Sequence, residues 1–334
     1  MSATLPAPTA AADSIVEVRN LEKRFGAFRA VAGISFSVAR GEIFGFLGPN
    51  GAGKSTTIRM LCGLLAPSGG TGRVAGLDIR TDTERIKSHI GYMSQKFSLY
   101  DELTVEENID FYSGIYRLPK TRKAARKEWV LRMAGLTEHR RSRTADLSGG
   151  WKQRLALGCA VLHEPPILFL DEPTSGVDPN SRRQFWDLIY ELAGQGVTVF
   201  VTTHYMEESE YCDRLGIIYN GQLIALGRPR ELKTKHMTDA VLEIDCPRPQ
   251  DAMAVLERLP AVKETALFGK GLHAVVPAPD TAIPAIRAAL AAAGQPSTRI
   301  ERIVPTLEDV FVSLIEAHSA VRQHTAGAQE EFRR

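Results

Sequence analysis

The sequence lacks any apolar run long enough to cross a lipid bilayer. A membrane-spanning helix needs about 18 to 20 consecutive apolar residues, and no stretch of the 334 residues approaches that length. The first segment, 1–13, is rich in Ala, Pro and Thr and has no long apolar block, so it does not read as a secretory signal. We therefore expect a frayed N-terminal tail and a chain with no membrane span of its own.

The sequence also lacks a paired cysteine spacing and has only a small net charge. Four cysteines (Cys62, Cys159, Cys212 and Cys246) are scattered without a paired spacing, which argues against disulfides or a thiolate metal site and favours reduced thiols in a cytoplasmic protein. The formal net charge of +2 argues against a dedicated nucleic-acid binder. The apolar fraction of 44% is that of an ordinary globular protein, and the length allows more than one domain.

Short apolar runs alternate with amphipathic ones from residue 15 to about 235. This order predicts an α/β core with a largely parallel sheet covered by helices. A stretch between Thr104 and Ala134 is helical without intervening strands, which predicts a helical insertion at about 96–160. The expected strands are Ile15–Val18, Ile34–Val38, Ile43–Leu47, Ile90–Met93, Ile167–Leu170, Val197–Thr202 and Leu215–Tyr219, and the expected helices include Ser55–Leu65 and Pro179–Ala193.

The insertion carries a basic run with two interpretations. Its members are Lys120, Arg122, Lys123, Arg126 and Lys127. The simpler interpretation is a solvated helix face, and the alternative is a patch that meets anionic lipid.

After a break near Lys233–Asp239, the remaining segments follow the order βαββαβ. This order predicts a small ferredoxin-like α+β domain over 238–318. A final helix is expected at Thr306–Ile315, and residues 319–334 are expected to be a flexible tail. The first domain is then expected to span 14–237.

A glycine-rich segment follows the run Ile43–Leu47 and precedes a predicted helix. It matches the pattern G-x-x-x-x-G-K-[ST], whose glycines let backbone N–H groups surround phosphate oxygens and whose helix adds a positive end. Lys54 can then reach the β- and γ-phosphates, and Ser55 can bind Mg²⁺. The predicted nucleotide contacts are Gly48, Pro49, Asn50, Gly51, Ala52, Gly53, Lys54, Ser55 and Thr56.

Two adjacent carboxylates end the apolar run Ile167–Leu170. Asp171 is placed to bind the metal, and Glu172 is a candidate general base for the attacking water. A pair of acids at a strand end can also be only a helix cap. The following Pro173 and the upstream phosphate loop favour the catalytic interpretation.

The segment Leu147-Ser148-Gly149-Gly150 followed by Trp151-Lys152-Gln153-Arg154 resembles the signature of ATP-binding-cassette (ABC) ATPases. Further motifs follow in the family's order over roughly residues 15–235. Gln95 looks like the Q-loop glutamine, Asp178 lies in a segment similar to the D-loop, and His204 resembles the switch histidine. Phe25 occupies the place of the aromatic residue that stacks on adenine.

The resemblance implies a role for each motif and a P-loop ABC ATPase core with a helical subdomain. Ser148 and Gly150 would contact the γ-phosphate held by a second copy, so that two protomers enclose two ATP molecules. His204 would position the water, and Gln95 would sense Mg²⁺. Taken singly, a histidine or glutamine of this kind is usually structural, and the order and spacing of the motifs favour the functional interpretation. Two residues depart from the family pattern: Phe25 replaces a more common Tyr, and Trp151 replaces the usual Gln.

The amino-acid sequences of the signature and of three further segments resemble those of ATPase subunits of bacterial drug exporters. The three segments are His163–Pro166, Thr203–Glu208 and Pro305–Phe311. That branch implies a homodimer or paired ATPase subunit, ATP and Mg²⁺, and a separate integral membrane permease. The expected location is the cytoplasmic face of the cell membrane. A soluble ABC ATPase of translation or DNA repair is the alternative, but such proteins usually carry two cassettes or a long coiled coil. A third possibility is a nucleotide sensor that barely hydrolyses ATP, against which Glu172 argues.

Overall fold

The computed structural model describes residues 13–96, 98–237, 239–269, 271–316 and 318, which form two compact units. The first unit is Met1–Arg228 and the second is Pro229–Arg334. Except for Asp13, the expected terminal tails lie outside the described residues. Among the residues that are described, no helix is both long and apolar enough to cross a bilayer. The units divide before α8 (Pro229–His236), whereas the expected boundary at 237 lies after it.

A six-stranded sheet forms the centre of the first unit. Its strand order is β10-β9-β3-β8-β7-β6, in which all neighbours are parallel except β10 and β9. Three of the strands are buried at every residue, as expected for a parallel sheet covered on both faces. The bounds are β3 (Ile43–Leu47), β6 (Ile90–Met93), β7 (Ile167–Asp171), β8 (Thr198–Thr203), β9 (Arg214–Tyr219) and β10 (Gln222–Gly227).

A second, antiparallel sheet of the first unit was not predicted. Its order is β2-β1-β4-β5, with β1 (Ser14–Phe25), β2 (Phe28–Ala39), β4 (Gly69–Val74) and β5 (Leu77–Asp78). Strand β4 was not predicted from the sequence because it contains three glycines, which have low strand propensity. Gly70 is required there: it has φ +74°, and a Cβ atom would lie 2.1 Å from the carbonyl oxygen of Asn20.

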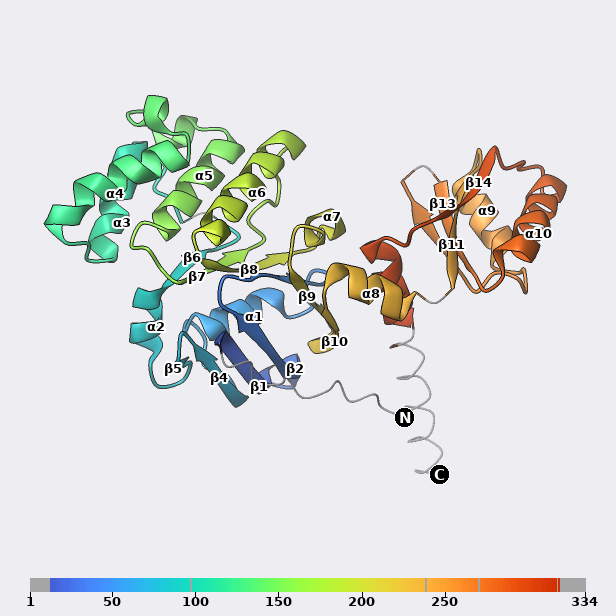
Figure 1. Cartoon of the computed structure of the whole chain (residues 1–334), viewed down its shortest axis with the longest axis horizontal. Coiled ribbons are helices and arrows are strands. Elements are labelled where there is room, and N and C mark those ends of the chain that lie inside the picture. The colour runs from blue at the N-terminus through green and yellow to red at the C-terminus, as the bar shows by residue number, and fades with distance from the viewer. Residues whose placement is uncertain (1–12, 97, 238, 270, 317, 319–334) are drawn as a thin grey trace. The chain divides into compact units, whose positions relative to one another are not determined.

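The core of the first unit packs between the two sheets around α1 (Lys54–Leu61). Ile58 and Leu61 of α1 are fully buried in one hydrophobic cluster with Phe36 of β2 and Phe44 of β3. Phe36 and Phe44 stack with ring centroids 5.6 Å apart. Figure 1 shows α1 on one side of the six-stranded sheet and α3 to α6 on the other. This packing fixes the end of β3 and the start of α1, between which the glycine-rich loop runs.

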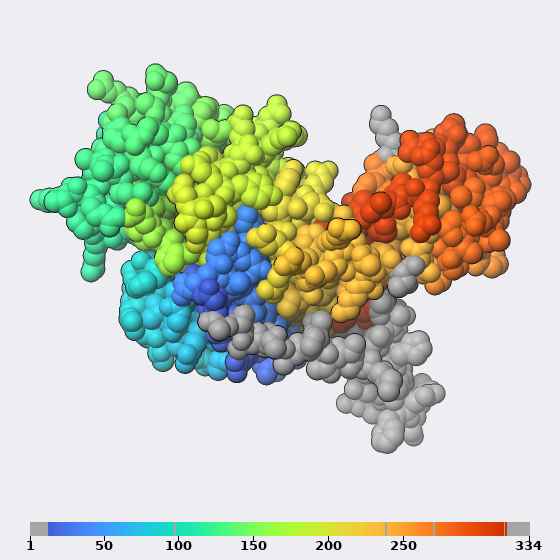
Figure 2. All heavy atoms as spheres, viewed as in Figure 1, coloured from blue at the N-terminus to red at the C-terminus, as the bar shows by residue number. Residues whose placement is uncertain are grey.

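The helical insertion has a hydrophobic core of its own. Its helices are α3 (Val105–Ile115), α4 (Lys120–Met133) and α5 (Gly149–Ala160), with short 3₁₀ turns at Thr137–His139 and Thr144–Asp146. Thr104 and Glu107 form a capping box that starts α3. In Figure 2 this segment, coloured green, gathers into one lobe of the first unit. The remaining helices of the unit are α2 (Thr83–His89), α6 (Pro179–Gly194) and α7 (Met206–Ser209).

The basic run of α4 is partly neutralised by acidic side chains. Four of its five members pair with two acids: Lys123 and Lys127 with Asp110 of α3, and Arg122 and Arg126 with Glu164. These ion pairs lower the positive charge that the run offers to an anionic surface.

The second unit has the ferredoxin-like order that the sequence predicted. Its strands form an antiparallel sheet in the order β12-β13-β11-β14. Two helices share a hydrophobic cluster with one face of this sheet, as Leu256, Ile286 and Leu242 illustrate. The bounds are β11 (Ala240–Asp245), α9 (Pro249–Leu256), β12 (Glu264–Phe268), β13 (Gly271–Val276), α10 (Pro279–Ala292) and β14 (Arg299–Ile303).

A final helical stretch, 307–316, is tied to the sheet by a buried pair. Asp309 Oδ1 lies 2.7 Å from Nδ1 of His273 on β13, and Asp309 Oδ2 accepts hydrogen bonds from the backbone and hydroxyl of Thr306. Burial by itself raises the pKa of Asp309, but the hydrogen bonds from His273 and Thr306 hold it below its ordinary value. Glu264 has the opposite shift: burial, followed by the charges of Glu316 and Asp309, raises its pKa to about 7.

The raised pKa of Glu264 predicts that the second unit loses stability as the solution becomes alkaline. The folded state holds this proton more tightly than the unfolded state, so the stabilisation is complete below the ordinary value of 4.5 and is lost as the pH rises through about 7. Between pH 6 and 8 we expect a loss of about 1 kcal/mol, since solvent screens this half-buried group. Glu264→Gln should remove that loss in denaturant titrations at the two pH values. An unchanged loss in this variant, equal to that of the exposed control Glu257→Gln, would refute the assignment.

Candidate functional site

The phosphate-loop residues link β3 to α1 and form an open turn at the end of the central sheet. Gly51 and Gly53 have φ of +79° and +111°, which L-residues with a side chain rarely adopt. A Cβ atom on Gly48 would lie 2.3 Å from the carbonyl oxygen of Ile218, whereas one on Gly51 would meet nothing within 4 Å. The loop is therefore packed against the sheet on one side and open on the other. The N–H groups of the first turn of α1 have no partner within the helix.

Lys54 is the first residue of α1 and is buried, with 4% of its surface exposed. Its Nζ donates to the carbonyl oxygens of Gly48 at 2.7 Å and Pro49 at 3.2 Å. The same atom lies 3.0 Å from Oε1 of Glu172, whose side chain is only 6% exposed. The predicted phosphate-binding lysine and the predicted base thus form a buried ion pair.

Asp171 ends β7 and lies next to Ser55 of α1. Its Oδ1 accepts hydrogen bonds from Ser55 Oγ at 3.0 Å and from Thr202 Oγ1 at 2.8 Å. Burial raises the pKa of Asp171, and the bonds from Thr202 and Ser55 partly oppose this effect. Thr202 was not predicted as a site residue; the sequence signal available was its place in Thr202-Thr203-His204, directly before the predicted histidine.

Glu172 holds an unusual backbone conformation with φ +49°. Its N–H donates to the carbonyl oxygen of Thr202 on the neighbouring strand, which fixes the residue at the edge of the sheet. Non-glycine residues in this region are uncommon and cluster at functional sites. From this position the carboxylate of Glu172 reaches Lys54.

Gln95 and His204 complete the cluster on the second carboxylate oxygen of Glu172. Gln95, which follows β6, donates from Nε2 to Glu172 Oε2 at 3.0 Å. His204, which follows β8, places Nδ1 3.3 Å from the same oxygen, without the alignment of a hydrogen bond. Together with Lys54 of α1, these residues bring three segments that are distant in sequence to one carboxylate.

The remaining predicted residues lie outside this cluster. Ser148 is the N-cap of α5 and is exposed, as is Gly149, whereas Gly150 is buried. Asp178 caps α6 by accepting a hydrogen bond from the N–H of Ser181 at 2.9 Å. Within the described part of the chain, no hydrogen bond or ion pair joins these residues to Lys54 or Glu172. The Phe25 ring, at the end of β1, is 50% exposed, with Lys23 Nζ 5.1 Å from its centroid.

Trp151, on α5, packs within the helical insertion. Its ring lies 4.7 Å from the ring of His139, and the guanidinium of Arg154 sits 4.8 Å from its centroid. The side chain is partly buried against the core of the insertion. This departure from the usual signature therefore leaves the exposed Ser148 and Gly149 in place.

The oxygen atoms near Ser55 fit a magnesium ion. Mg²⁺ prefers hard oxygen ligands and is usually held by one or two carboxylates together with substrate phosphates. Ser55 Oγ and Asp171 Oδ1, which lie 3.0 Å apart beside the phosphate loop, are oxygen ligands of that kind. Among the residues that the structure describes, no group of three or more His, Cys, Asp or Glu side chains could cage a metal by itself. The amide nitrogen of Gln95 is directed to Glu172, which leaves its amide oxygen as the possible ligand.

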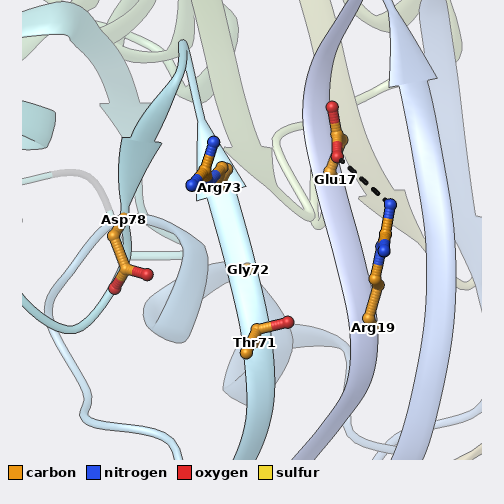
Figure 3. A pocket seen from close by; sticks show the side chains of 6 residues that line it. All are labelled: Glu17, Arg19, Thr71, Gly72, Arg73 and Asp78. Atoms are coloured by element: carbon orange, nitrogen blue, oxygen red, sulfur yellow. Dashed lines mark ion pairs between the residues drawn. The ribbon is translucent and has the colours of Figure 1, made fainter. Parts of the chain in front are cut away.

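A hollow of about 310 Å³ lies elsewhere on the first unit, on the antiparallel sheet. Figure 3 shows its lining side chains on β1, β4 and β5, with Glu17 and Arg19 in an ion pair of 4.0 Å. None of the lining residues was predicted for the nucleotide site. Two carboxylates beside two guanidinium groups also give little net attraction for phosphate. The lining residues are Glu17, Arg19, Thr71, Gly72, Arg73 and Asp78.

Comparison with protein families places these motifs in a known group. The family model described as ABC transporter matches residues 31–175. A second model, described as AAA domain, putative AbiEii toxin, Type IV TA system, matches residues 143–208. Both matches fall within the first unit, which contains the phosphate loop, Asp171 and Glu172.

Two curated relatives illustrate the similarity. The probable multidrug ABC transporter ATP-binding protein YbhF of Escherichia coli K12 is 52% identical over 230 residues, which cover 68% of this chain. This chain spans only 39% of the length of YbhF. The Nod factor export ATP-binding protein I of Ralstonia nicotianae is 36% identical over 314 residues, or 92% of this chain and 96% of that protein.

Solved structures agree with this assignment. A structure of cbiO1 from Clostridium perfringens, described as part of the ABC transporter complex cbiONQ, matches with a TM-score of 0.62 at 28% identity, over 74% of this chain and 96% of its own. The ATP-binding cassette MJ0796, in a dimeric post-hydrolysis state bound to ADP and Pi, matches with a TM-score of 0.58 at 26% identity, over 64% of this chain and 98% of its own. The chain therefore belongs to the ATP-binding proteins of ABC transporters, and its first unit is an ABC-type ATPase cassette.

Proposed function

We propose that this chain is the ATP-hydrolysing subunit of an ABC exporter and drives efflux through a separate membrane permease. The observation that carries the proposal is the convergence of Lys54, Gln95 and His204 on the buried carboxylate of Glu172. A base at that position, next to a phosphate-binding loop, is what hydrolysis of a γ-phosphate requires. The relatives named for export favour this role over a soluble ABC protein of translation or DNA repair.

Within this proposal the cluster has a division of roles. Glu172 accepts a proton from the attacking water, and His204 orients that water beside the γ-phosphate. Lys54 leaves Glu172 and the loop carbonyls to bind the β- and γ-phosphates, which releases the carboxylate for its role as base. The exposed ring of Phe25 stacks on the adenine, since an aromatic face binds a base without specific hydrogen bonds.

Ser55, Asp171 and Gln95 are proposed to hold Mg²⁺ with the phosphates. When bound, the ion neutralises phosphate charge and orients the γ-phosphoryl group. The hydrogen bond from Ser55 to Asp171 keeps two of these oxygens together in advance. Thr202 supports the same carboxylate from the adjacent strand.

Two copies of the chain are proposed to share each nucleotide. Ser148 and Gly149 stand exposed at the N-terminus of α5, where free N–H groups and the helix dipole favour an anion. These residues and Gly150 would meet the γ-phosphate bound by the phosphate loop of the other copy, with Asp178 contributing at the seam. The dimeric form of the related cassette supports this arrangement.

The permease partner is proposed to dock on an apolar patch of the helical insertion. The patch consists of Tyr100, Phe111 and Ile115, which are 44%, 39% and 59% exposed. Tyr100 and Phe111 make an edge-to-face contact at 4.5 Å. Tyr112, adjacent to Phe111 on α3, donates a hydrogen bond to the carbonyl oxygen of Ser98, three residues after Gln95. A permease bound there would hold the chain at the cytoplasmic face of the membrane and sense the Gln95 segment.

This proposal is tested by capture of the partner. Ile115→Asp is expected to lower co-purification with a polytopic protein from solubilised membranes by about tenfold or more, since a buried interface anchor is lost. Leu64→Asp, a change at a comparably exposed apolar residue outside the patch, is the matched control. The hydrolysis rate of the isolated cassette should stay within about twofold in both variants. Recovery of ribosomes or DNA in place of a polytopic protein would overturn the exporter assignment.

We also propose a cassette domain over 14–237 and an accessory domain over 238–318 that supports pairing of two copies. The hydrophobic cluster of Leu242, Leu256 and Ile286 gives the second unit a core of its own, which is consistent with a separate domain. Its place after the cassette in the sequence is the basis for the proposed role in pairing.

A further inference from the structure

The loop that follows Glu172 is held from one side by a buried glutamine of the signature helix. Gln153, on the second turn of α5, has no exposed surface. Its Nε2 donates a hydrogen bond of 2.7 Å to the carbonyl oxygen of Pro173, the residue next to Glu172. Its Oε1 is buried and has no hydrogen-bond partner among the described residues. The signature helix is therefore joined directly to the backbone beside the catalytic carboxylate.

The next residue of the loop is held from the other side by a buried glutamate. Glu208, on α7, is 1% exposed, and its Oε1 accepts a hydrogen bond from the hydroxyl of Thr174. Arg182 of α6 places Nε 3.5 Å from the same oxygen. The Arg182 guanidinium also stacks over the ring of Tyr205, 4.0 Å from its centroid. Since Tyr205 follows His204, this network ties the loop to the segment of the switch histidine.

These contacts carry a cost that packing alone does not explain. An amide or a carboxylate without water must be compensated by hydrogen bonds, and apolar residues of similar volume are often as stable or more stable at such positions. Gln153 Oε1 and Glu208 Oε2 are both buried without a hydrogen bond in the described structure. Two incompletely satisfied polar side chains, one on α5 and one on α7, thus hold the consecutive loop residues Pro173 and Thr174, which points to a role in setting the position of that loop.

We propose that Gln153 and Glu208 are positioning residues that clamp Pro173 and Thr174 and thereby couple the signature turn and the switch histidine to Glu172. The inference rests on the proposed function. In the paired state Ser148, on the same helix as Gln153, contacts the nucleotide of the other copy. A shift of α5 on that contact is transmitted through Gln153 to Pro173 and so to Glu172. The clamp thus links hydrolysis in one site to closure of the other.

The test compares turnover with nucleotide affinity in two variants that preserve shape. Gln153→Met removes the donor to Pro173, and Thr174→Val removes the donor to Glu208 while leaving the Glu208–Arg182 pair. Each variant is expected to lower kcat about tenfold or more. The KM for ATP and the affinity of the ATP-free protein for a fluorescent ATP analogue should stay within about twofold of wild type. The reason is that a small misplacement of a catalytic group lowers the reaction rate more than it weakens binding. Glu207→Gln, at the exposed neighbour of Glu208, is the matched control and should keep wild-type kcat.

The cooperativity of hydrolysis separates a clamp from a merely structural role. The Hill coefficient for ATP should exceed 1 in the wild type and fall toward 1 in Gln153→Met, because the link between the two sites is lost. Equal losses of kcat and affinity, or kcat within twofold of wild type in both variants, would overturn the clamp. A wild type that neither hydrolyses ATP nor pairs would instead overturn the proposed function on which it rests. If Gln153→Met does not fold, Thr174→Val alone decides by the same criteria.

Discussion

Replacing Glu172 with glutamine is expected to lower the rate of ATP hydrolysis about a thousandfold, since a positioned general base contributes factors of 10² to 10⁴. Glutamine keeps the size of the side chain and can still contact Lys54, Gln95 and His204, which surround the carboxylate within 3.3 Å. It cannot accept the proton of the attacking water. Binding of ATP should therefore persist while the chemical step is blocked.

The accompanying expectation for Glu172→Gln concerns assembly. With hydrolysis blocked, two copies should remain closed around two ATP molecules, and the protein should elute as a dimer when ATP and Mg²⁺ are present. Glu207→Gln makes the same chemical change at an exposed position nearby and should remain active and monomeric after turnover. Size-exclusion chromatography with light scattering gives the readout. A variant that stays monomeric with saturating ATP would contradict the shared-site mechanism.

Replacing Lys54 with methionine is expected to have two separable effects. The first is loss of nucleotide binding by about 100-fold, since hydrogen bonds between charged groups contribute about 1.5–3 kcal/mol and 1.4 kcal/mol corresponds to tenfold. The second is loss of about 3 kcal/mol of folding stability, because the buried carboxylate of Glu172 loses its cationic partner. Isothermal titration with ATP and denaturant unfolding measure the two effects independently.

A double variant distinguishes the two roles of Lys54. When Glu172→Gln is added to Lys54→Met, no unpaired charge remains in the pocket, so most of the lost stability should return. Nucleotide binding should not return, because the phosphates still lack the lysine. Additive losses of stability in the double variant would show that the 3.0 Å contact between Lys54 and Glu172 does not contribute to the fold.

Several parts of the site were accessible from the sequence because neighbouring residues define them. Gly48 to Ser55 form a continuous segment, a loop that leads into α1, whose glycine spacing is imposed by backbone conformation, so the pattern predicts the local structure. Asp171 and Glu172 follow a run of apolar residues, which places them at the end of a buried strand. The βαββαβ order of the second unit was likewise readable, since alternation of apolar residues is a local property.

Other parts depended on contacts between distant segments. The glycine-rich strand β4 is held by pairing with β1, and its own residues have low strand propensity. The sequence showed the five cations of the basic run on α4, and only the structure revealed that Asp110 and Glu164 lie beside them and offset part of their charge. Trp151 stood out in the sequence, but only the structure revealed that it contacts His139 and Arg154 within the helical insertion.

By itself, the sequence determined the nucleotide loop, the two carboxylates and the order of the motifs, because each is defined within a few consecutive residues. Only the tertiary structure decided that Lys54 pairs with Glu172 and that Gln153 and Glu208 hold the adjoining loop. Those contacts join segments separated by twenty or more residues, and their partners are selected by the packing of β7, β8 and α5. The segment Gly48–Ser55 thus marks the proposed phosphate site, and the fold decides which side chains reach it.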